Sequence, residues 1–348
     1  ESTRALEKSG FRVEPTGVEH GTVMAIKGGK SFEVTTLRRD VATDGRHAEV
    51  AFSESFREDA ARRDFTFNAL YMDNTGHITD FFGGLRDLEK GYVRFVGDPA
   101  QRLQEDWLRA LRYVRFYGRF GQQPPDAETF SALKAAAPAL PNLSAERITT
   151  EVLKTVVTPK APQALMLMAD LDYFNALALG SFSVDRFATY IAAFPATRDP
   201  LTLLLAGFWW KEQKGEQTES PLLTTPHLRF SKKQLKFVKA MAPENLQKLD
   251  VDNIPLSCWR LGPEQAAQLW RYESVFGETS AQNAQSAAKI AAQTTIPPFP
   301  LKGADLAALG YEKGPEMGRA LKKAEKWWAE NGFPQREKCL LWVKNNTP

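Results

Sequence analysis

The sequence is poor in cysteine, in histidine and in net charge. Its 348 residues include only two Cys, Cys258 and Cys339, and four His, and the formal net charge is +3. Two cysteines so far apart indicate neither a disulfide framework nor a thiolate metal site, and they are typical of a reducing compartment. A nearly neutral chain must bind nucleic acid through local basic patches.

Long hydrophobic runs are also missing. No apolar segment approaches the ~20 residues that span a bilayer, and no signal peptide opens the chain. We therefore expect a cytoplasmic protein with no membrane partner. The apolar fraction of 43% is sufficient for buried cores, and the length of 348 residues favours several domains.

Two different hydrophobic patterns divide the chain. Alternation and Gly turns between Phe11 and Phe52 predict short strands, with a hairpin turn at Lys27–Lys30. The polar stretch between Leu37 and His47 predicts a mobile loop. Helical periodicity begins near Ser55 and continues almost to the end, apart from a hairpin at Tyr71–Phe81. The predicted fold class is α+β, with an α/β head followed by helices.

Helix signals and linkers subdivide the helical part. One long amphipathic helix is predicted from Asp98-Pro99 to about Phe120, because Pro124-Pro125 ends it. The polar segment 211–226 predicts a linker, and 277–302 predicts an irregular stretch. Further helices are expected at Asp126–Ala137, Ser144–Val157 (with Ser144 as N-cap) and Ala161–Tyr173.

The segment Glu58–Phe116 is unusually rich in arginine. From Arg57 to Arg119 there are ten Arg and one Lys against ten Asp and Glu. Arg presents a rigid fork of donors that suits phosphate and base edges. On the predicted helix, Asp106 and Arg109 share one face. Such a carboxylate and guanidinium match the donor and acceptor edge of C and A and reject G and U; the alternative is an intrahelical salt bridge.

Three motifs in this segment resemble a known family. They are EDxxRRDFTxNAL at 58–70, DxFGGxxDL at 80–88 and RxxEDxLRxLRxxRF at 102–116. Together with further matches, they resemble the class II nucleotidyltransferases, which comprise bacterial CCA-adding enzymes and poly(A) polymerases. The C-terminal region is similar to that of the alphaproteobacterial CCA-adding enzymes. The further matches are 16–23, 32–40, 43–47, 144–151, 228–231 and 301–321.

The resemblance implies roles for the arginine-rich motifs. Arg62, Arg63 and Asp64 match the segment that holds the ribose and the triphosphate, and Asn68 shares the sugar contact. Guanidinium groups suit phosphate, and a carboxylate can accept from the 2′-hydroxyl. We expect these four residues to bind the nucleotide.

A second group matches the protein template for the incoming base. Asp106 and Arg109 pair with the base in the family, and Arg112 supports them. Arg147 matches a position near the nucleotide, and a structural salt bridge to Glu151 is an equal alternative.

The resemblance also implies movable and catalytic elements. Asp44 and Arg46 match the family's flexible loop, with a solvated loop as the alternative. Gly83-Gly84 matches a hinge between head and neck. Glu33 matches a possible third carboxylate near the metals, although it could equally be a strand-edge residue.

The family's main catalytic signature is not found in this sequence. A Gly-Gly turn followed by two Asp holds the Mg²⁺ pair in the family, and neither occurs before Phe11. We expect either that a preceding segment carries them or that the chain is a degenerate relative, and we favour the first. This chain alone is expected to contain no metal ligands, to bind CTP or ATP weakly and to have little nucleotidyltransferase activity.

A basic run downstream predicts an RNA contact. The segment His227–Lys239 contains no acidic residue, and three of its lysines share a helical face. A solvated helix surface is the alternative, whereas the resemblance supplies tRNA as a ligand. The proposed RNA-binding residues are Arg229, Lys232, Lys233 and Lys236; Lys322, Lys323 and Lys326 form a second candidate, beside Trp327 and Trp328 as packing anchors.

The resemblance implies one function. We expect CCA addition to tRNA 3′ ends with CTP, ATP and Mg²⁺; a poly(A) polymerase and a non-catalytic RNA-binding protein are the alternatives. The sequence predicts no oligomeric state. The expected domains are an incomplete nucleotidyltransferase head (1–82), a helical neck with the base template (83–157), a helical body (158–226) and a tRNA-binding tail (227–348).

Overall fold

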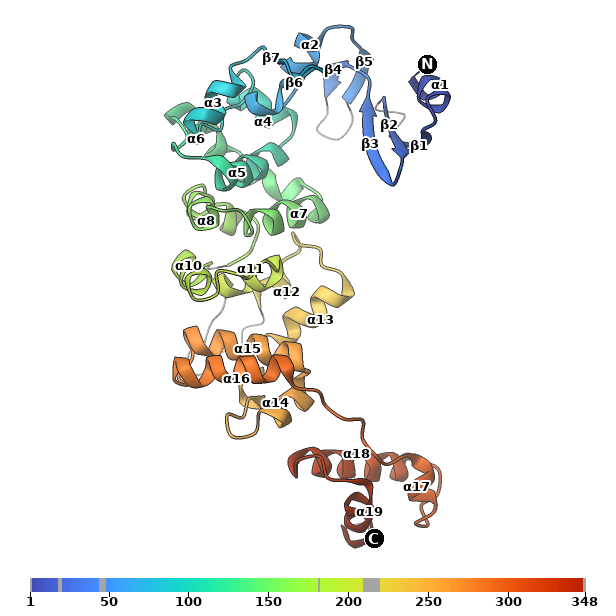
Figure 1. Cartoon of the computed structure of the whole chain (residues 1–348). Coiled ribbons are helices and arrows are strands. Elements are labelled where there is room, and N and C mark those ends of the chain that lie inside the picture. Colours follow the sequence, from blue (N-terminus) through green and yellow to red (C-terminus); the bar gives the residue numbers. More distant parts are fainter. Residues whose placement is uncertain (1, 18–20, 44–47, 181, 209–219, 347–348) are drawn as a thin grey trace. The chain divides into compact units, whose positions relative to one another are not determined.

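The computed structural model describes residues 2–17, 21–43, 48–180, 182–208 and 220–346 (Figure 1). Strands occupy only the first part of the chain, and helices make up the rest, which confirms the predicted α+β class. The chain folds into two compact units. The N-terminal unit consists of residues 1–185, 198–204 and 225–229, and the C-terminal unit consists of residues 186–197, 205–224 and 230–348. The domain boundaries expected from the sequence stay a prediction.

The first sheet contains three antiparallel strands, β1 (Arg12–Gly17), β2 (Thr22–Lys27) and β3 (Lys30–Thr35). Lys27 pairs with Lys30 across a two-residue turn, so the predicted hairpin is confirmed. Gly28 and Gly29 at this turn have φ angles of 60° and 74°. This left-handed turn matches the twist of the two strands and favours glycine.

The predicted loop between Leu37 and His47 is wrong in its first part. β4 (Arg38–Thr43) is a strand, and it pairs antiparallel with β5 (Ala48–Phe52). The polar composition concealed the strand because its pairing with β5 is invisible to a local pattern. Asp44 and Arg46 lie outside the described residues.

The arginine-rich segment forms several short elements of the N-terminal unit. The predicted hairpin at Tyr71–Phe81 is confirmed by the pairing of β6 with β7. The elements in order are α2 (Phe56–Ala61), the 3-10 helix η2 (Thr66–Asn68), β6 (Leu70–Met72), β7 (Ile78–Asp80) and α3 (Gly84–Lys90).

The single helix predicted from Asp98 to Phe120 is wrong. Two helices occupy this region, α4 (Pro99–Glu105) and α5 (Leu108–Phe120). Between them Asp106 is extended, with φ −156° and ψ 104°. Its Oδ1 accepts a hydrogen bond from the Leu108 amide at 3.1 Å. A short acidic side chain that binds nearby backbone in this way competes with helix formation, and here it separates α4 from α5.

An aromatic cluster joins η2 to α5. The rings of Phe65 and Phe95 are 5.0 Å apart, and the rings of Phe67 and Phe116 are also 5.0 Å apart. Phe65 is fully buried, and Tyr113 of α5 is 1% exposed. Packing of such rings stabilises the unit by area burial and by their edge-to-face geometry. The cluster holds the arginine-bearing helix α5 against the segment that follows α2.

The three helices predicted after Pro125 are confirmed by α6, α7 and α8, and η3 and α9 were not predicted. Ser144 occupies the N-cap position of α7, but its side chain makes no capping hydrogen bond. Asp126 caps α6 by accepting from the Thr129 amide at 2.8 Å. These helices are α6 (Ala127–Ala135), η3 (Ala137–Asn142), α7 (Ala145–Thr155), α8 (Ala161–Asp170) and α9 (Tyr173–Ala176).

After α9 the described residues form helices joined by loops and no strand. The elements are α10 (Val184–Ala193), α11 (Pro200–Phe208), α12 (Pro221–Thr224), α13 (Lys232–Ala240), η4 (Pro243–Lys248), α14 (Ile254–Leu261), α15 (Pro263–Phe276), α16 (Ala281–Gln293), α17 (Gly303–Ala307), α18 (Pro315–Glu330) and α19 (Arg336–Asn346). No helix among the described residues is long and apolar enough to cross a membrane.

Two predicted irregular regions contain helices. α12 lies within the predicted linker 211–226, and α16 lies within the predicted irregular stretch 277–302. The buried face of α16 consists of alanines, which pack with Trp270 of α15. A stripe of small residues gives little hydrophobic contrast, so periodicity alone did not reveal this helix. These alanines are Ala284, Ala287, Ala288 and Ala291.

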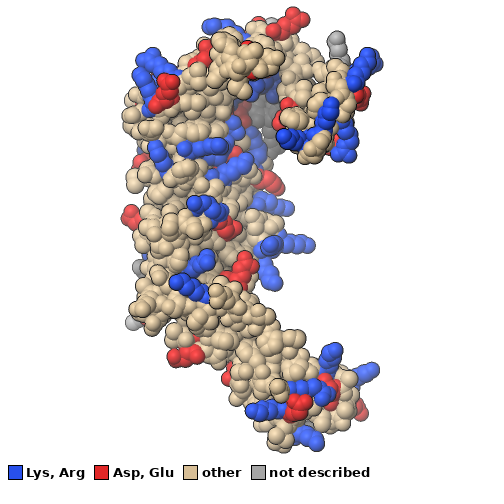
Figure 2. Space-filling model, viewed as in Figure 1, with Lys and Arg blue, Asp and Glu red and all other residues tan. Residues whose placement is uncertain are grey.

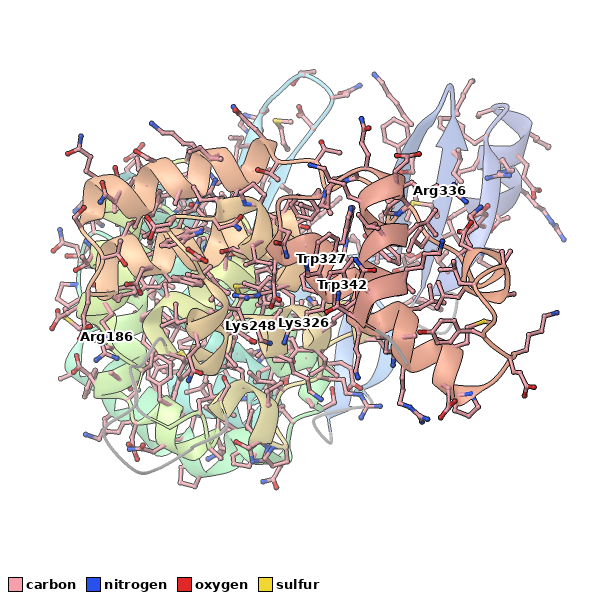
Figure 3. The ribbon with its side chains drawn as sticks, turned by 90° about the horizontal axis from the view of Figure 1, so that it is seen from below. Arg186, Lys248, Lys326, Trp327, Arg336 and Trp342 are labelled. Atoms are coloured by element: carbon pink, nitrogen blue, oxygen red, sulfur yellow. The ribbon has the colours of Figure 1, made fainter. Side chains whose placement is uncertain are left out.

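The C-terminal helices pack around tryptophan. Trp328 of α18 is 2% exposed and lies edge-on to Phe333, with ring centroids 4.8 Å apart. Trp327 stacks on Trp342 of α19 at 5.2 Å, and Figure 3 shows the two side by side. The prediction that Trp327 and Trp328 are packing anchors is confirmed.

Candidate nucleotide-binding site

The segment Arg62-Arg63-Asp64, called the RRD segment below, lies where α2 ends. Ser55 caps the helix by accepting from the Glu58 amide, and Arg62 is its C-terminal cap residue. Arg62 and Arg63 thus follow the last turn of α2, and Asp64 leads into η2. The chain leaves the helix at Arg62, so the three charged side chains need hydrogen-bond partners to fix them.

Asp59 of α2 supplies the partner for both arginines. Its Oδ1 accepts from Arg62 Nε at 2.9 Å and Nη2 at 2.5 Å, and its Oδ2 accepts from Arg63 Nη2 at 2.9 Å. Tyr71 Oη donates to Oδ2 at 2.6 Å, and the Arg38 amide donates to Oδ1 at 3.2 Å. One carboxylate therefore binds two adjacent guanidinium groups and anchors them to β6 and β4.

The surroundings of Asp59 strongly favour its charged form. Burial acts to raise its pKa, but hydrogen bonds from Tyr71, Arg63 and Arg62 outweigh burial and hold the pKa at about 2. Burial and the same carboxylate raise the pKa of Tyr71 to about 12. A phenol with a pKa of about 12 is protonated at neutral pH and can donate to Asp59.

Asp64 is joined to α5 and to η2. Its Oδ2 accepts from Arg112 Nε at 2.6 Å and Nη2 at 2.5 Å, and its Oδ1 accepts from Asn68 Nδ2 at 2.9 Å. The predicted proximity of Asn68 and Asp64 is therefore observed. Arg112 holds the carboxylate assigned to the sugar, and its predicted support of the base template stays a prediction.

Arg109 also reaches from α5 to the RRD segment. Its Nη1 donates to Glu105 Oε2 at 2.5 Å and to the Arg102 carbonyl at 2.9 Å. Its Nη2 lies 3.4 Å from the Arg62 carbonyl. The guanidinium is held mostly out of solvent, with 13% of the side chain exposed. The groups predicted to read the base and to bind phosphate are thus neighbours, although 47 residues separate Arg62 from Arg109.

Asp106 does not share a helical face with Arg109, contrary to prediction. Its extended backbone lies before α5, and its Oδ2 accepts from Arg147 Nη2 of α7 at 2.7 Å. The alternative of an Arg147–Glu151 salt bridge is also wrong. Glu151 binds Arg115 of α5 at 2.5 Å instead. Arg147 binds Asp106, because the extended backbone at Asp106 brings the Asp106 carboxylate to the Arg147 guanidinium.

These contacts leave capacity for a ligand. Each carboxylate oxygen can accept more than one hydrogen bond, and a guanidinium has five donor hydrogens. Asp106 uses its two oxygens on one donor each, and its side chain remains 27% exposed. Arg63 is 39% exposed, more than Arg62 at 14%. The arrangement can therefore accept from an amino group at Asp106 and donate to anions at Arg63.

Two supporting carboxylates were not singled out from the sequence. Asp59 precedes Arg62 and Arg63 by three and four residues, and Glu105 precedes Arg109 by four. On a continuous helix these spacings place side chains on one face. Here Arg63 follows the end of α2, and the extended backbone at Asp106 separates Glu105 of α4 from Arg109 of α5. The spacing rule would have found both, had it been applied to every acid in the motifs.

The backbone at the predicted hinge, Gly83-Gly84, is hydrogen-bonded to the Asp80 side chain. The Asp80 carboxylate accepts from the amides of four successive residues, 82–85, at 2.8 to 3.1 Å. These bonds lower the pKa of Asp80 against the opposing effect of burial. Gly83 has φ 79°, and Gly84 lies against the Thr66 backbone. The hinge role stays a prediction.

The described residues form no metal centre. Glu33 is exposed on β3, opposite Met24, and its role as a third carboxylate stays a prediction. No group of three or more His, Cys, Asp or Glu among the described residues could hold a metal ion.

The predicted RNA-binding lysines lie on α13. Ser231 and Gln234 form a capping box at its N-terminus, and Val238 is buried beneath it. Lys232, Lys233 and Lys236 are exposed. Arg229 belongs to the N-terminal unit, where its amide donates to Thr149 Oγ1 at 2.7 Å.

The second basic candidate, on α18, is electrostatically mixed. Lys322 and Lys323 are exposed, but Lys326 lies 3.8 Å from Glu330. Figure 2 likewise shows acidic side chains between the basic ones on the C-terminal helices. α13 therefore offers the more uniform positive surface.

Known proteins are similar to nearly the whole chain. Residues 1–94 match the family described as "Poly A polymerase head domain", and residues 125–179 match "Probable RNA and SrmB- binding site of polymerase A". The chain is 33% identical over 353 aligned residues to "CCA tRNA nucleotidyltransferase 1, mitochondrial" of Homo sapiens, with 97% of this chain and 78% of the relative covered. The chain belongs to the CCA-adding nucleotidyltransferase family.

Bacterial members of the CCA-adding family are also similar. A CCA-adding enzyme of Streptococcus pneumoniae is 41% identical over 177 residues, which cover 50% of this chain and 44% of that protein. The crystal structure of the Bacillus stearothermophilus CCA-adding enzyme in complex with CTP matches with a TM-score of 0.70 and 26% identity. It covers 96% of this chain and 83% of that chain.

Proposed function

We propose that this chain acts in template-independent addition of CCA to tRNA 3′ ends and that its N-terminal unit selects CTP and ATP. One arrangement supports the proposal. Arg109 and Arg112 of α5 contact the segment that contains Arg62 and Asp64, so groups suited to base, sugar and phosphate lie together. The relatives that match nearly the whole chain are CCA-adding enzymes.

Each part of the nucleotide would meet a different chemistry. Arg62 and Arg63 would bind the triphosphate, because guanidinium groups make strong charge-assisted hydrogen bonds to phosphate. Asp64 and Asn68 would accept from and donate to the ribose hydroxyls. These side chains are already hydrogen-bonded to one another or to Asp59, so little ordering is needed when the nucleotide binds.

The base would be selected by Asp106 and Arg109. A carboxylate accepts from the exocyclic amino groups of C and A, and a guanidinium donates to their adjacent ring nitrogens. G and U place an acceptor where this pair needs a donor. The exposed part of Asp106 and the unused donors of Arg109 are consistent with that role.

The family resemblance implies a divalent metal, Mg²⁺, for the transfer step. Two-metal catalysis requires clustered carboxylates, and no such group of three ligands occurs among the described residues. The described residues therefore do not fit that metal site. Their proposed roles are nucleotide selection and tRNA binding.

A binding experiment tests the nucleotide site without requiring turnover. Arg62→Gln with Arg63→Gln is expected to weaken CTP and ATP binding at least tenfold, because each loses a charge-assisted bond to phosphate. Arg57→Gln is the control, since Arg57 lies exposed on α2 outside this hydrogen-bond network. Equal affinity of the double variant and the wild type for CTP would refute the assignment.

The tRNA surface is tested separately. Lys232→Glu with Lys236→Glu is expected to weaken tRNA binding and to flatten its dependence on salt, because fewer counterions are released. Lys322→Glu on α18 is the control from the mixed-charge surface. Unchanged tRNA affinity and salt slope in the double variant would exclude α13 as the tRNA-binding surface.

Poly(A) synthesis is the second candidate, and the description of the head-domain family favours it. The two activities differ in product. With a tRNA that lacks its 3′ CCA, a CCA-adding preparation extends with CTP alone and adds A only after C. Extension by repeated A with ATP alone would establish the poly(A) alternative.

A further inference from the structure

The Asp59 carboxylate lies behind the two arginines of the proposed triphosphate site. Its side chain is 1% exposed, against 14% for Arg62 and 39% for Arg63. A nucleotide that reaches the guanidinium groups would therefore not touch Asp59. The strong burial of a charged group requires compensating partners, and here the partners are the arginines themselves.

We propose that Asp59 is a positioning residue, which fixes the guanidinium groups of Arg62 and Arg63 in place for the triphosphate. This inference rests on the proposed function, which assigns the two arginines to phosphate. Asp59 acts through both of them at once.

The geometry divides the carboxylate between the two arginines. Oδ1 accepts from Arg62 at 2.5 and 2.9 Å, whereas Oδ2 accepts from Arg63 at 2.9 and 3.3 Å. Two neighbouring guanidinium groups repel one another, and a shared carboxylate between them lowers that repulsion. The three groups together retain one net positive charge, which is available to a phosphate.

Two other elements hold the carboxylate itself. Tyr71 of β6 donates to Oδ2 at 2.6 Å, and the backbone amide of Arg38 on β4 donates to Oδ1 at 3.2 Å. Arg62 Nε also lies 3.1 Å from the Arg38 carbonyl. The position of Arg62 and Arg63 is thus set by three elements, α2, β4 and β6, rather than by the end of α2 alone.

The neighbouring residue offers a matched comparison. Glu58 is also a carboxylate on α2, but it is exposed and accepts from Ser53 Oγ at 2.6 Å, with no arginine partner among the described residues. Asp59→Asn removes one acceptor charge from behind the arginines, whereas Glu58→Gln makes the same chemical change without touching them. The pair separates an effect of positioning from a general effect of charge on α2.

The test measures the affinities of the whole chain for CTP and for CMP, which lacks the two outer phosphates. Asp59→Asn is expected to lower the ratio of the CTP affinity to the CMP affinity about tenfold, the loss of roughly one charge-assisted hydrogen bond. Glu58→Gln is expected to leave the ratio unchanged. A purely structural role of Asp59 would weaken both ligands equally and leave the ratio as in the wild type, which would overturn the proposal.

A double-variant cycle identifies the route of the effect. In the Arg62→Gln, Arg63→Gln background, Asp59→Asn is expected to change the affinity ratio no further, because the groups it positions are gone. Independent, additive losses would overturn the proposal. If the arginine variants alone leave CTP affinity unchanged, the proposed function itself fails, which is a different result from an ineffective Asp59→Asn.

A milder variant guards against misfolding of Asp59→Asn. Tyr71→Phe removes one donor to Oδ2 and keeps the charge of Asp59. We expect this folded variant to lose about twofold to threefold in the same affinity ratio, which is less than a full hydrogen bond. Far-ultraviolet circular dichroism verifies the fold of each variant. An unchanged ratio in Tyr71→Phe would count against the positioning role.

Discussion

The two glycines at the start of α3, Gly83 and Gly84, are both expected to lose stability on substitution by alanine, and Gly84 is expected to lose more. Gly83 has φ 79° and open space where a Cβ would lie, whereas Gly84 starts the helix against η2. A Cβ at Gly84 would lie 2.6 Å from the Thr66 carbonyl carbon and 2.9 Å from the Phe67 nitrogen, where ordinary contacts begin at 3.4 Å. These are backbone atoms, so the whole of α3 must move away.

The size of each effect follows from its cause. Gly83→Ala costs about 1 kcal/mol, because an L-residue is strained in the left-handed region. Gly84→Ala is expected to cost about 3 kcal/mol, the upper part of the usual range for overpacking. The displacement of α3 would also strain the buried bond from Thr66 Oγ1 to Asp87 Oδ2, which is 2.7 Å long.

Urea unfolding monitored by circular dichroism measures both variants, and hydrogen exchange of the amides of α3 gives the local effect. Gly83→Asn serves as the control, since Asn tolerates the left-handed region better than Ala and should recover part of the loss. Equal losses of stability at Gly83 and Gly84 would refute this explanation. In that case, the close approach of α3 to Thr66 would not limit the residue at Gly84.

Two further predictions concern buried charges. The pKa of Asp59 is lowered from 3.8 to about 2. The stability that the charged carboxylate provides is therefore complete above about pH 5 and is lost as the pH falls from about 5 to about 2. Wild type should lose about 2 kcal/mol more than Asp59→Asn between about pH 5 and pH 2, measured by urea unfolding; equal losses would contradict the assignment. Glu151→Gln breaks a pair with Arg115 in which the side chains are 5% and 12% exposed, and it should cost about 3 kcal/mol. Glu146→Gln, also on α7, breaks a pair with Arg229 whose side chains are 68% and 75% exposed, and it should cost less than about 1 kcal/mol.

Local rules predicted the features that depend on neighbours in sequence. The hairpin at Lys27–Lys30 follows from two glycines between alternating segments. Asn68 lies one turn after Asp64, and the two side chains are hydrogen-bonded as that spacing suggests. The family motifs supplied the hypothesis that this site binds a nucleotide.

Features that depend on distant partners were not predictable from the pattern. The extended backbone at Asp106 accompanies two bonds of its carboxylate, which accepts from the Leu108 amide and from Arg147 of α7. The helical pattern of the neighbouring residues concealed this break. The predicted partner of Glu151 was wrong for a similar reason, because α5 packs on α7 and brings Arg115 to 2.5 Å from the Glu151 carboxylate. The strand β4 was missed because its pairing lies with β5.

The choice of base tests the central proposal most directly. The measurement is the equilibrium affinity of the chain for CTP, ATP, GTP and UTP under one set of conditions, with Asp106→Ala beside the wild type. CTP and ATP should bind at least tenfold more tightly than GTP and UTP, and Asp106→Ala should abolish that preference. Equal binding of all four nucleotides by the wild type, or a preference that survives in Asp106→Ala, would contradict base selection by Asp106 and Arg109.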